Sequence, residues 1–128
     1  MSNLFIGLGA LSAFVSVAAG AFGAHALKQM LDADMLAVFN TAVDYQFFHS
    51  LGLIIIGILQ TVSPRRCHTA AAWAMLAGIV IFSGSLYILS TTGIRWLGMI
   101  TPVGGTGLLI AWLILASCYL TDTLKKEF

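Results

Sequence analysis

Long stretches without a charged residue constrain this chain more than any other feature of its sequence. The few charges fall in short clusters, and the apolar runs between them approach the ~20 residues needed to span a hydrocarbon core about 30 Å thick. Only 9% of the 128 residues are charged, whereas soluble domains carry about 25%. We therefore predict an all-α membrane protein. Its net charge of +1 provides no basic field that would attract nucleic acid.

The apolar pattern predicts a single domain of four transmembrane helices. The first run has no Lys or Arg before it and is longer than a signal-peptide core, so it is expected to be a retained span. Ser63-Pro64 is expected to end the second helix, which Asp32 or Asp34 caps. A preceding amphipathic stretch lies in the interface plane or forms the start of that helix. The domain covers residues 1–128, the spans about 4–24, 45–62, 70–90 and 100–120, and the amphipathic stretch about 34–44.

The connections between the spans are short, which favours antiparallel neighbours and an up-down bundle. An even number of spans places both termini and the middle connection on one side. That side holds Arg65, Arg66, Lys125 and Lys126, against Lys28 and Arg95 on the other. Because cytoplasmic loops carry the excess of Lys and Arg, both termini are expected to be cytoplasmic.

Small residues recur at helical spacing in three of the runs. Such residues let two helix backbones approach closely where no hydrophobic driving force exists between helices. The stripes are expected to pack the helices inside one bundle, and the alternative is contact with a second copy or another membrane protein. The predicted packing residues are Ser12, Ser16, Gly20, Ala24, Gly78, Gly104 and Gly105.

Polar residues gather in the outer half of the predicted bundle. Tyr45 and His49 share a helix face, whereas Asp44 does not and would more easily meet His25. Three interpretations stay open: hydrogen bonds that tie the helices together, a ligand-binding site, and a proton or ion path. The candidate cluster consists of His25, Asp44, Tyr45, His49, Ser83, Ser85, Tyr87 and Thr101.

No established metal or catalytic motif is present, so neither an enzyme nor a metal site is expected. No cofactor is predicted, although a haem between His25 and His49, or a quinone, stays open as an alternative. Cys67 and Cys118 fall at the cytoplasmic end, where reduced thiols rather than a disulfide are expected. The adjacent Cys67 and His68 are not expected to form a useful ligand pair.

Four segments resemble the YgdD-like family of small, uncharacterised bacterial inner-membrane proteins with eukaryotic relatives. The resemblance covers nearly the whole chain, in the same order, and implies a multi-pass protein of the bacterial inner membrane with four spans. It carries over no activity. The segments are GAFGAHAL at 20–27, YQFFHSL at 45–51, FSGSLY at 82–87 and ITPVGG at 100–105.

Two functional hypotheses follow from these features. The first is a non-enzymatic helical module that binds a lipid-like or quinone-like ligand or docks on a larger membrane complex. The second is an oligomeric transporter or proton-relay protein that uses His25, Asp44 and His49. The expected partners are the lipid bilayer and either a second copy or another membrane protein.

Overall fold

Four long helical rods make up the computed structural model, which describes residues 1–128 and contains no strand. Each rod is long and apolar enough to cross a membrane. The predicted fold class, an all-α protein with four spanning-length helices, is confirmed. The elements are α1 (Ser2–Phe22), η1 (Gly23–Leu27), α2 (Lys28–Met30), α3 (Ala33–Val62), α4 (Arg66–Thr92), η2 (Arg95–Met99) and α5 (Thr101–Glu127).

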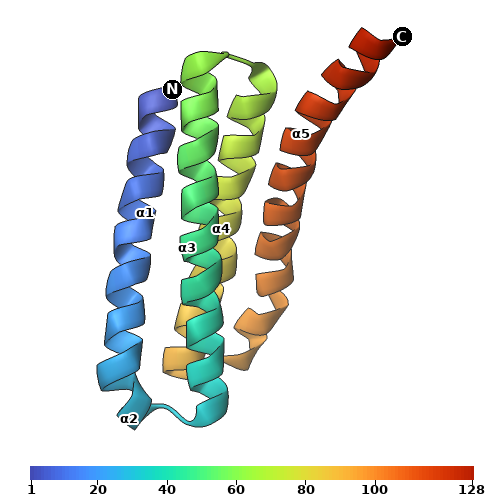
Figure 1. Cartoon of the computed structure of the whole chain (residues 1–128). Helices are drawn as coiled ribbons and strands as arrows, with labels where there is room; N and C mark the ends of the chain where they lie inside the picture. The colour runs from blue at the N-terminus through green and yellow to red at the C-terminus, as the bar shows by residue number, and fades with distance from the viewer.

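Neighbouring rods run antiparallel, and both termini lie at the same end of the bundle (Figure 1). Helix α1 packs on α3, α3 on α4 and α4 on α5, whereas no comparable contact joins α1 to α5. The two central helices, α3 and α4, therefore carry most of the interhelical contacts. The C-terminal part of α5 leans away from the other rods (Figure 1).

The ends of the rods follow from local backbone chemistry. Asp32 caps α3 by accepting a hydrogen bond from the backbone N–H of Met35 at 2.8 Å. Helix α3 ends before Ser63-Pro64, and α4 ends at Gly93, whose φ of 73° lies in the left-handed region that favours glycine. The amphipathic stretch at 34–44 is continuous with the rest of α3, so it forms the start of that helix.

Helices α4 and α5 make the closest backbone approach. A Cβ at Gly104 would lie 2.3 Å from the backbone nitrogen of Phe82, and one at Gly78 would lie 2.8 Å from that of Leu108. Only a residue without a side chain fits at these two positions. A Cβ at Gly105, in contrast, would meet the Phe82 ring at 3.5 Å, an ordinary contact distance.

The predicted packing residues of α1, together with Ala24 in the following η1, divide between two environments. Ser12 and Ser16 face α3 and form hydrogen bonds there. A Cβ at Gly20 would lie 3.2 Å from a methyl group of Val43, whereas Ala24 is exposed.

Cys67 and Cys118 are joined by a disulfide, so the prediction of unpaired thiols is wrong. Cys67 lies in the first turn of α4 and Cys118 in the second half of α5. Because these helices are antiparallel neighbours, the two residues meet at the same end of the bundle, with their Cα atoms 6.2 Å apart.

Candidate functional site

Gln46 is the centre of a buried hydrogen-bond network near the middle of the bundle. Its amide nitrogen donates to the Ser12 carbonyl at 3.1 Å, and its amide oxygen accepts from the Tyr87 hydroxyl at 2.6 Å. The Ser50 hydroxyl donates to the Ser12 hydroxyl at 2.7 Å. The network therefore connects α1, α3 and α4 through side chains that are largely shielded from the surroundings.

Other serine and threonine hydroxyls also bridge neighbouring helices. Ser83 donates to the Ala42 carbonyl at 2.8 Å, and the hydroxyls of Ser85 and Thr101 lie 2.7 Å apart. Together with Tyr87, these are four of the eight candidate cluster residues. The hydroxyl groups of all four residues form contacts between helices. This is the arrangement expected if the cluster ties the helices together by hydrogen bonds.

Tyr45 and His49 lie instead in a surface groove between α3, α4 and α5. The groove has a volume of about 360 Å³, and aromatic rings form much of its wall. Tyr45 stacks on Phe82 with ring centroids 4.5 Å apart, and the His49 ring lies 5.9 Å from that of Trp112. The groove lies near the level of the middle of α1, because Ser50, the neighbour of His49, contacts Ser12 there.

The hydrogen bonding of His49 fixes the role of each ring nitrogen. Nδ1 lies 2.7 Å from the backbone carbonyl oxygen of Tyr45. A carbonyl oxygen only accepts, so Nδ1 carries the proton of the neutral ring and Nε2 carries a lone pair. Neither Nε2 nor the Tyr45 hydroxyl has a hydrogen-bond partner in the protein. The groove therefore offers one free acceptor and one free donor.

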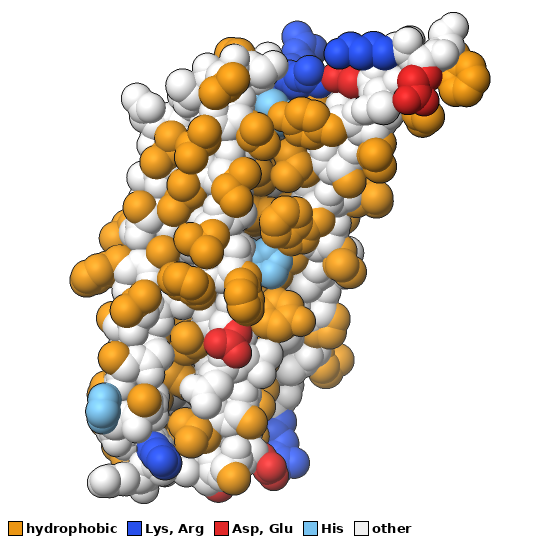
Figure 2. Space-filling view, viewed as in Figure 1, with side chains coloured by type: hydrophobic (Ala, Val, Ile, Leu, Met, Phe, Trp, Pro, Cys, Tyr) orange, Lys and Arg blue, Asp and Glu red, His pale blue; other side chains and the backbone are white.

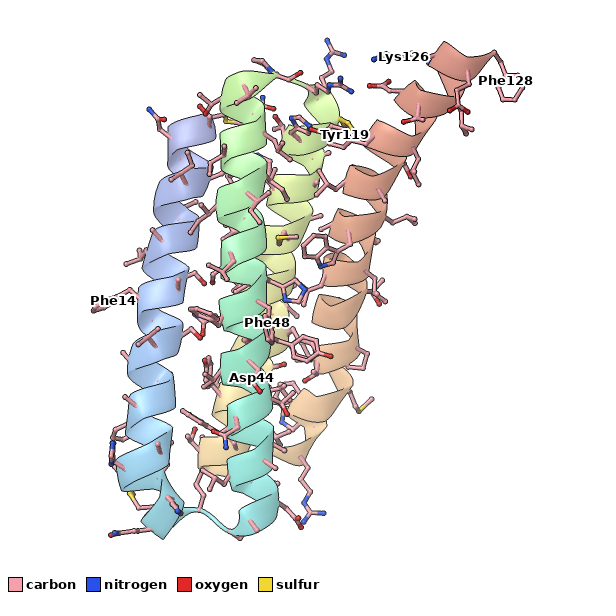
Figure 3. All side chains as sticks on the ribbon, in the orientation of Figure 1. Phe14, Asp44, Phe48, Tyr119, Lys126 and Phe128 are labelled. Atoms are coloured by element: carbon pink, nitrogen blue, oxygen red, sulfur yellow. A yellow bond between two sulfur atoms is a disulfide. The ribbon has the colours of Figure 1, made fainter.

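Asp44 lies on a different face, beside a second groove of about 270 Å³ between α1 and α3. It is exposed and forms no ion pair. Figure 3 labels it in the lower half of α3. In Figure 2 hydrophobic side chains are spread over the surface between the two ends, where few charged side chains appear. The neighbouring Val43 carbonyl contacts Ser16, which lies six residues before the end of α1. Asp44 therefore lies roughly 9 Å inside that end.

The structure does not bring His25 to the rest of the cluster. His25 is exposed on η1, whereas Ser50, the neighbour of His49, contacts Ser12. Thirteen residues separate Ser12 from His25 along one rod, which corresponds to roughly 20 Å. A haem held by His25 and His49 therefore does not fit, and no direct relay connects the two histidines.

A second polar cluster, which sequence reasoning missed, lies at the end of the bundle that holds both termini. His68 is fully buried, and its Nε2 lies 2.9 Å from the Tyr119 hydroxyl. Ligand atoms of Cys67, His68 and Cys118 all lie within 4.8 Å of one another. Cys67 and His68 alone indicate no useful ligand pair, and the structure adds a third potential ligand atom from Cys118 of α5, 51 residues away from Cys67.

Arg65 and Asp122 form an ion pair beside this cluster. The hydrogen bond from Arg65 lowers the pKa of the Asp122 carboxyl, and the carboxylate raises the pKa of the guanidinium in return. The guanidinium also lies 5.5 Å from the centre of the Tyr119 ring. The Arg65–Asp122 ion pair therefore connects the link between α3 and α4 to the C-terminal part of α5.

Comparison with known proteins places the chain in a family. Residues 19–105 match the family model described as "Protein of unknown function (DUF423)". The chain belongs to this family. It is 49% identical to the UPF0382 membrane protein SH2409 of Staphylococcus haemolyticus over 88% of this chain and 92% of the relative. It is 47% identical to the UPF0382 membrane protein YwdK of Bacillus subtilis over 88% and 93%. No solved structure matches.

The DUF423 match confirms the resemblance to an uncharacterised membrane-protein family. The matched range does not cover every residue of these sites. Gln46, Tyr45, His49 and Tyr87 lie inside the matched residues 19–105, whereas Cys118 lies beyond them. The buried network and the aromatic groove thus fall mostly within the part that the family model describes.

Replacing Asp44 with asparagine is expected to stabilise the folded protein by about 1–2 kcal/mol in a bilayer, because an unpaired carboxylate at this depth is costly. The free energy of unfolding of protein in bicelles would measure the gain. Asp34→Asn is the matched control, since Asp34 is exposed in the first turn of α3. Equal effects of the two substitutions would show that Asp44 is in water or already paired.

Proposed function

We propose that this DUF423 protein is a non-enzymatic membrane module that holds a lipid-like molecule with a ring-shaped, quinone-like headgroup. The groove lined by Tyr45, His49, Phe82 and Trp112 is the binding site. One observation carries the proposal: the Tyr45 hydroxyl and His49 Nε2 line the same largely apolar groove, and neither has a hydrogen-bond partner in the protein. An unpaired polar group in an apolar medium costs several kcal/mol, about 2–7 on transfer scales.

The chemistry of the groove suits a flat, oxygen-bearing ring. The Tyr45 hydroxyl can donate to a ring carbonyl, and His49 Nε2 can accept from a ring hydroxyl. Phe82 and Trp112 offer aromatic faces for stacking, and Gly105 in the groove wall leaves room beside them. The Thr106 hydroxyl already donates to the Pro102 carbonyl at 2.8 Å, so it leaves the polar contacts to Tyr45 and His49.

The cellular setting is part of the proposal. Arg65, Arg66, Lys125 and Lys126 lie toward the end of the bundle that carries both termini (Figure 1). This excess of positive charge supports a cytoplasmic location for that end. Relatives named as membrane proteins in Staphylococcus and Bacillus support the bacterial inner membrane. We also propose that the YgdD-like proteins and this family are one group, on the strength of the four shared segments.

Native mass spectrometry of protein extracted in a mild detergent tests the proposed ligand. The wild-type protein is expected to carry a discrete added mass, and His49→Ala is expected to lose it, because the substitution removes the free acceptor and one wall of the groove. Tyr45→Phe is expected to reduce occupancy about tenfold, the value of one hydrogen bond of about 1.4 kcal/mol.

His25→Ala is the matched control, since His25 is exposed and roughly 20 Å from the level of the groove. A ligand-free wild-type protein, or an added mass that survives His49→Ala, would contradict the proposed site. In the first case the groove is filled by ordinary acyl chains. In the second case the ligand binds elsewhere on the bundle.

Asp44 favours a second candidate function, docking on another membrane protein. Its carboxylate is exposed beside the α1–α3 groove. A partner helix that brings a cation to this groove would neutralise the charge and exclude lipid from it. Asp44→Asn is then expected to abolish co-purification of that partner in mild detergent, while the added mass in the aromatic groove is retained. Retention of the partner by Asp44→Asn would remove this candidate.

A further inference from the structure

Cys67, His68 and Cys118 form a compact group of soft ligand atoms at the end of the bundle that carries the termini. Their ligand atoms all lie within 4.8 Å of one another. We propose that, once the disulfide is reduced, these three side chains bind a thiophilic metal ion, Cu(I) or Zn(II). The site lies apart from the aromatic groove, and the proposal is independent of the ligand proposed there.

The buried imidazole of His68 is the strongest support for a ligand at this position. The ring is fully buried, and its Nδ1 has no hydrogen-bond partner. Nε2 lies 2.9 Å from the Tyr119 hydroxyl. In the tautomer whose Nε2–H donates to Tyr119, Nδ1 presents a lone pair for which the structure contains no partner at hydrogen-bond geometry. Metal-binding histidines typically have this arrangement, in which the second nitrogen donates to an outer partner that orients the ring.

The surroundings favour thiolates, the form of cysteine that binds metals. Cys67 lies in the first turn of α4, where the helix dipole places partial positive charge. The guanidinium of Arg65 lies 4.0 Å from the Cys118 sulfur. Two thiolates and one monovalent ion carry a net charge of −1, and Arg65, which also pairs with Asp122, places its positive charge beside them.

The ligand set selects the class of metal. Two thiolates and an imidazole suit Cu(I) in a three-coordinate site, or Zn(II) when a water completes a tetrahedron. An open groove of about 580 Å³, lined by Arg65, Cys67, Cys118 and Asp122 among others, reaches the sulfurs from the surface. Ions and water can therefore reach the site from the aqueous side of the bundle.

Reduction and metal binding balance as two separate steps. Two equivalents of an external thiol, supplied in the experiment, transfer two electrons and two protons to the sulfur–sulfur bond. The reductant becomes a disulfide, and Cys67 and Cys118 become thiols. Metal binding then displaces both thiol protons into water, so affinity is expected to fall at low pH.

Cobalt(II), a spectroscopic substitute for zinc, tests the site in the reduced, detergent-solubilised protein after removal of the reductant. One equivalent is expected to produce a thiolate-to-metal charge-transfer band, which Zn(II) then abolishes. Cys67→Ser and Cys118→Ser are expected to lose the band. Tyr119→Phe is expected to weaken binding about 10- to 100-fold, because it removes the group that orients His68. His25→Ala is the matched control and should bind as the wild-type protein does.

Thiol counting with a maleimide and far-ultraviolet circular dichroism establish that the sample is reduced and folded. Two free thiols in a folded protein without the band would overturn the proposal. A His68→Ala variant with unchanged spectrum and affinity would do the same. A pair that resists reduction while the protein stays folded also overturns it, and identifies a permanent disulfide between α4 and α5.

Discussion

Gly104→Ala is expected to lower the free energy of unfolding by about 3 kcal/mol, the upper part of the range for overpacking. The new Cβ would lie 2.3 Å from the backbone nitrogen of Phe82 and 2.7 Å from its Cα. A flexible side chain could rotate away from such a contact, but a helix backbone cannot. Helices α4 and α5 must therefore separate along this stretch, and the contact between Gly78 and Leu108 loosens with them.

Gly105→Ala provides the control from the adjacent residue. Its Cβ would meet the Phe82 ring at 3.5 Å, and alanine is favoured over glycine in a helix by about 1 kcal/mol. The variant is expected to be as stable as the wild-type protein or slightly more so. Unfolding in mixed micelles, followed by helical circular dichroism, compares the two substitutions. Equal midpoints for Gly104→Ala and Gly105→Ala would show that α4 and α5 are not in close contact at Gly104.

The sequence was sufficient to predict the helical rods, because hydropathy reports the cost of placing each segment in lipid. The ends of α3 and α4 were also predictable, since Asp32, Pro64 and Gly93 act on the local backbone. The first rod, however, continues through η1 to Met30, beyond the apolar run. Hydropathy measures transfer into the membrane, whereas helical hydrogen bonds continue into the polar interface.

It was harder to predict which residues come together at each site than to predict the helices that carry them. Tyr45 and His49 could be paired from sequence because a four-residue spacing places both on one helix face. The partners of Gln46 and His68, in contrast, lie 34 and 51 residues away, on other helices. Gln46 and Ser50 share a helix face with the buried Ala42 and Leu53. That shared apolar face was the sequence signal that both polar side chains are buried. No spacing within one helix indicates that His68 meets Cys118.

Gln46→Leu is expected to destabilise the protein by about 2–3 kcal/mol, since hydrogen bonds between membrane helices contribute about 0.6–1.7 kcal/mol each. The substitution removes the bonds from Gln46 to Ser12 and the bond that it accepts from Tyr87. It also leaves the Tyr87 hydroxyl without a partner in the interior, and an unsatisfied buried donor costs about 1–3 kcal/mol. Unfolding in the same mixed micelles measures the loss.

A double-mutant cycle with Tyr87→Phe separates the hydrogen bond from the change in packing. Because the Tyr87 hydroxyl contacts the Gln46 amide oxygen at 2.6 Å, the two substitutions are expected to be coupled. The double variant should be more stable than the sum of the single losses predicts, by about 0.6–1.7 kcal/mol. Additive losses would mean that the pair is separated in the folded protein. The network around Gln46 would then not determine how α1, α3 and α4 fit together, and helix packing at the small residues would carry that role alone.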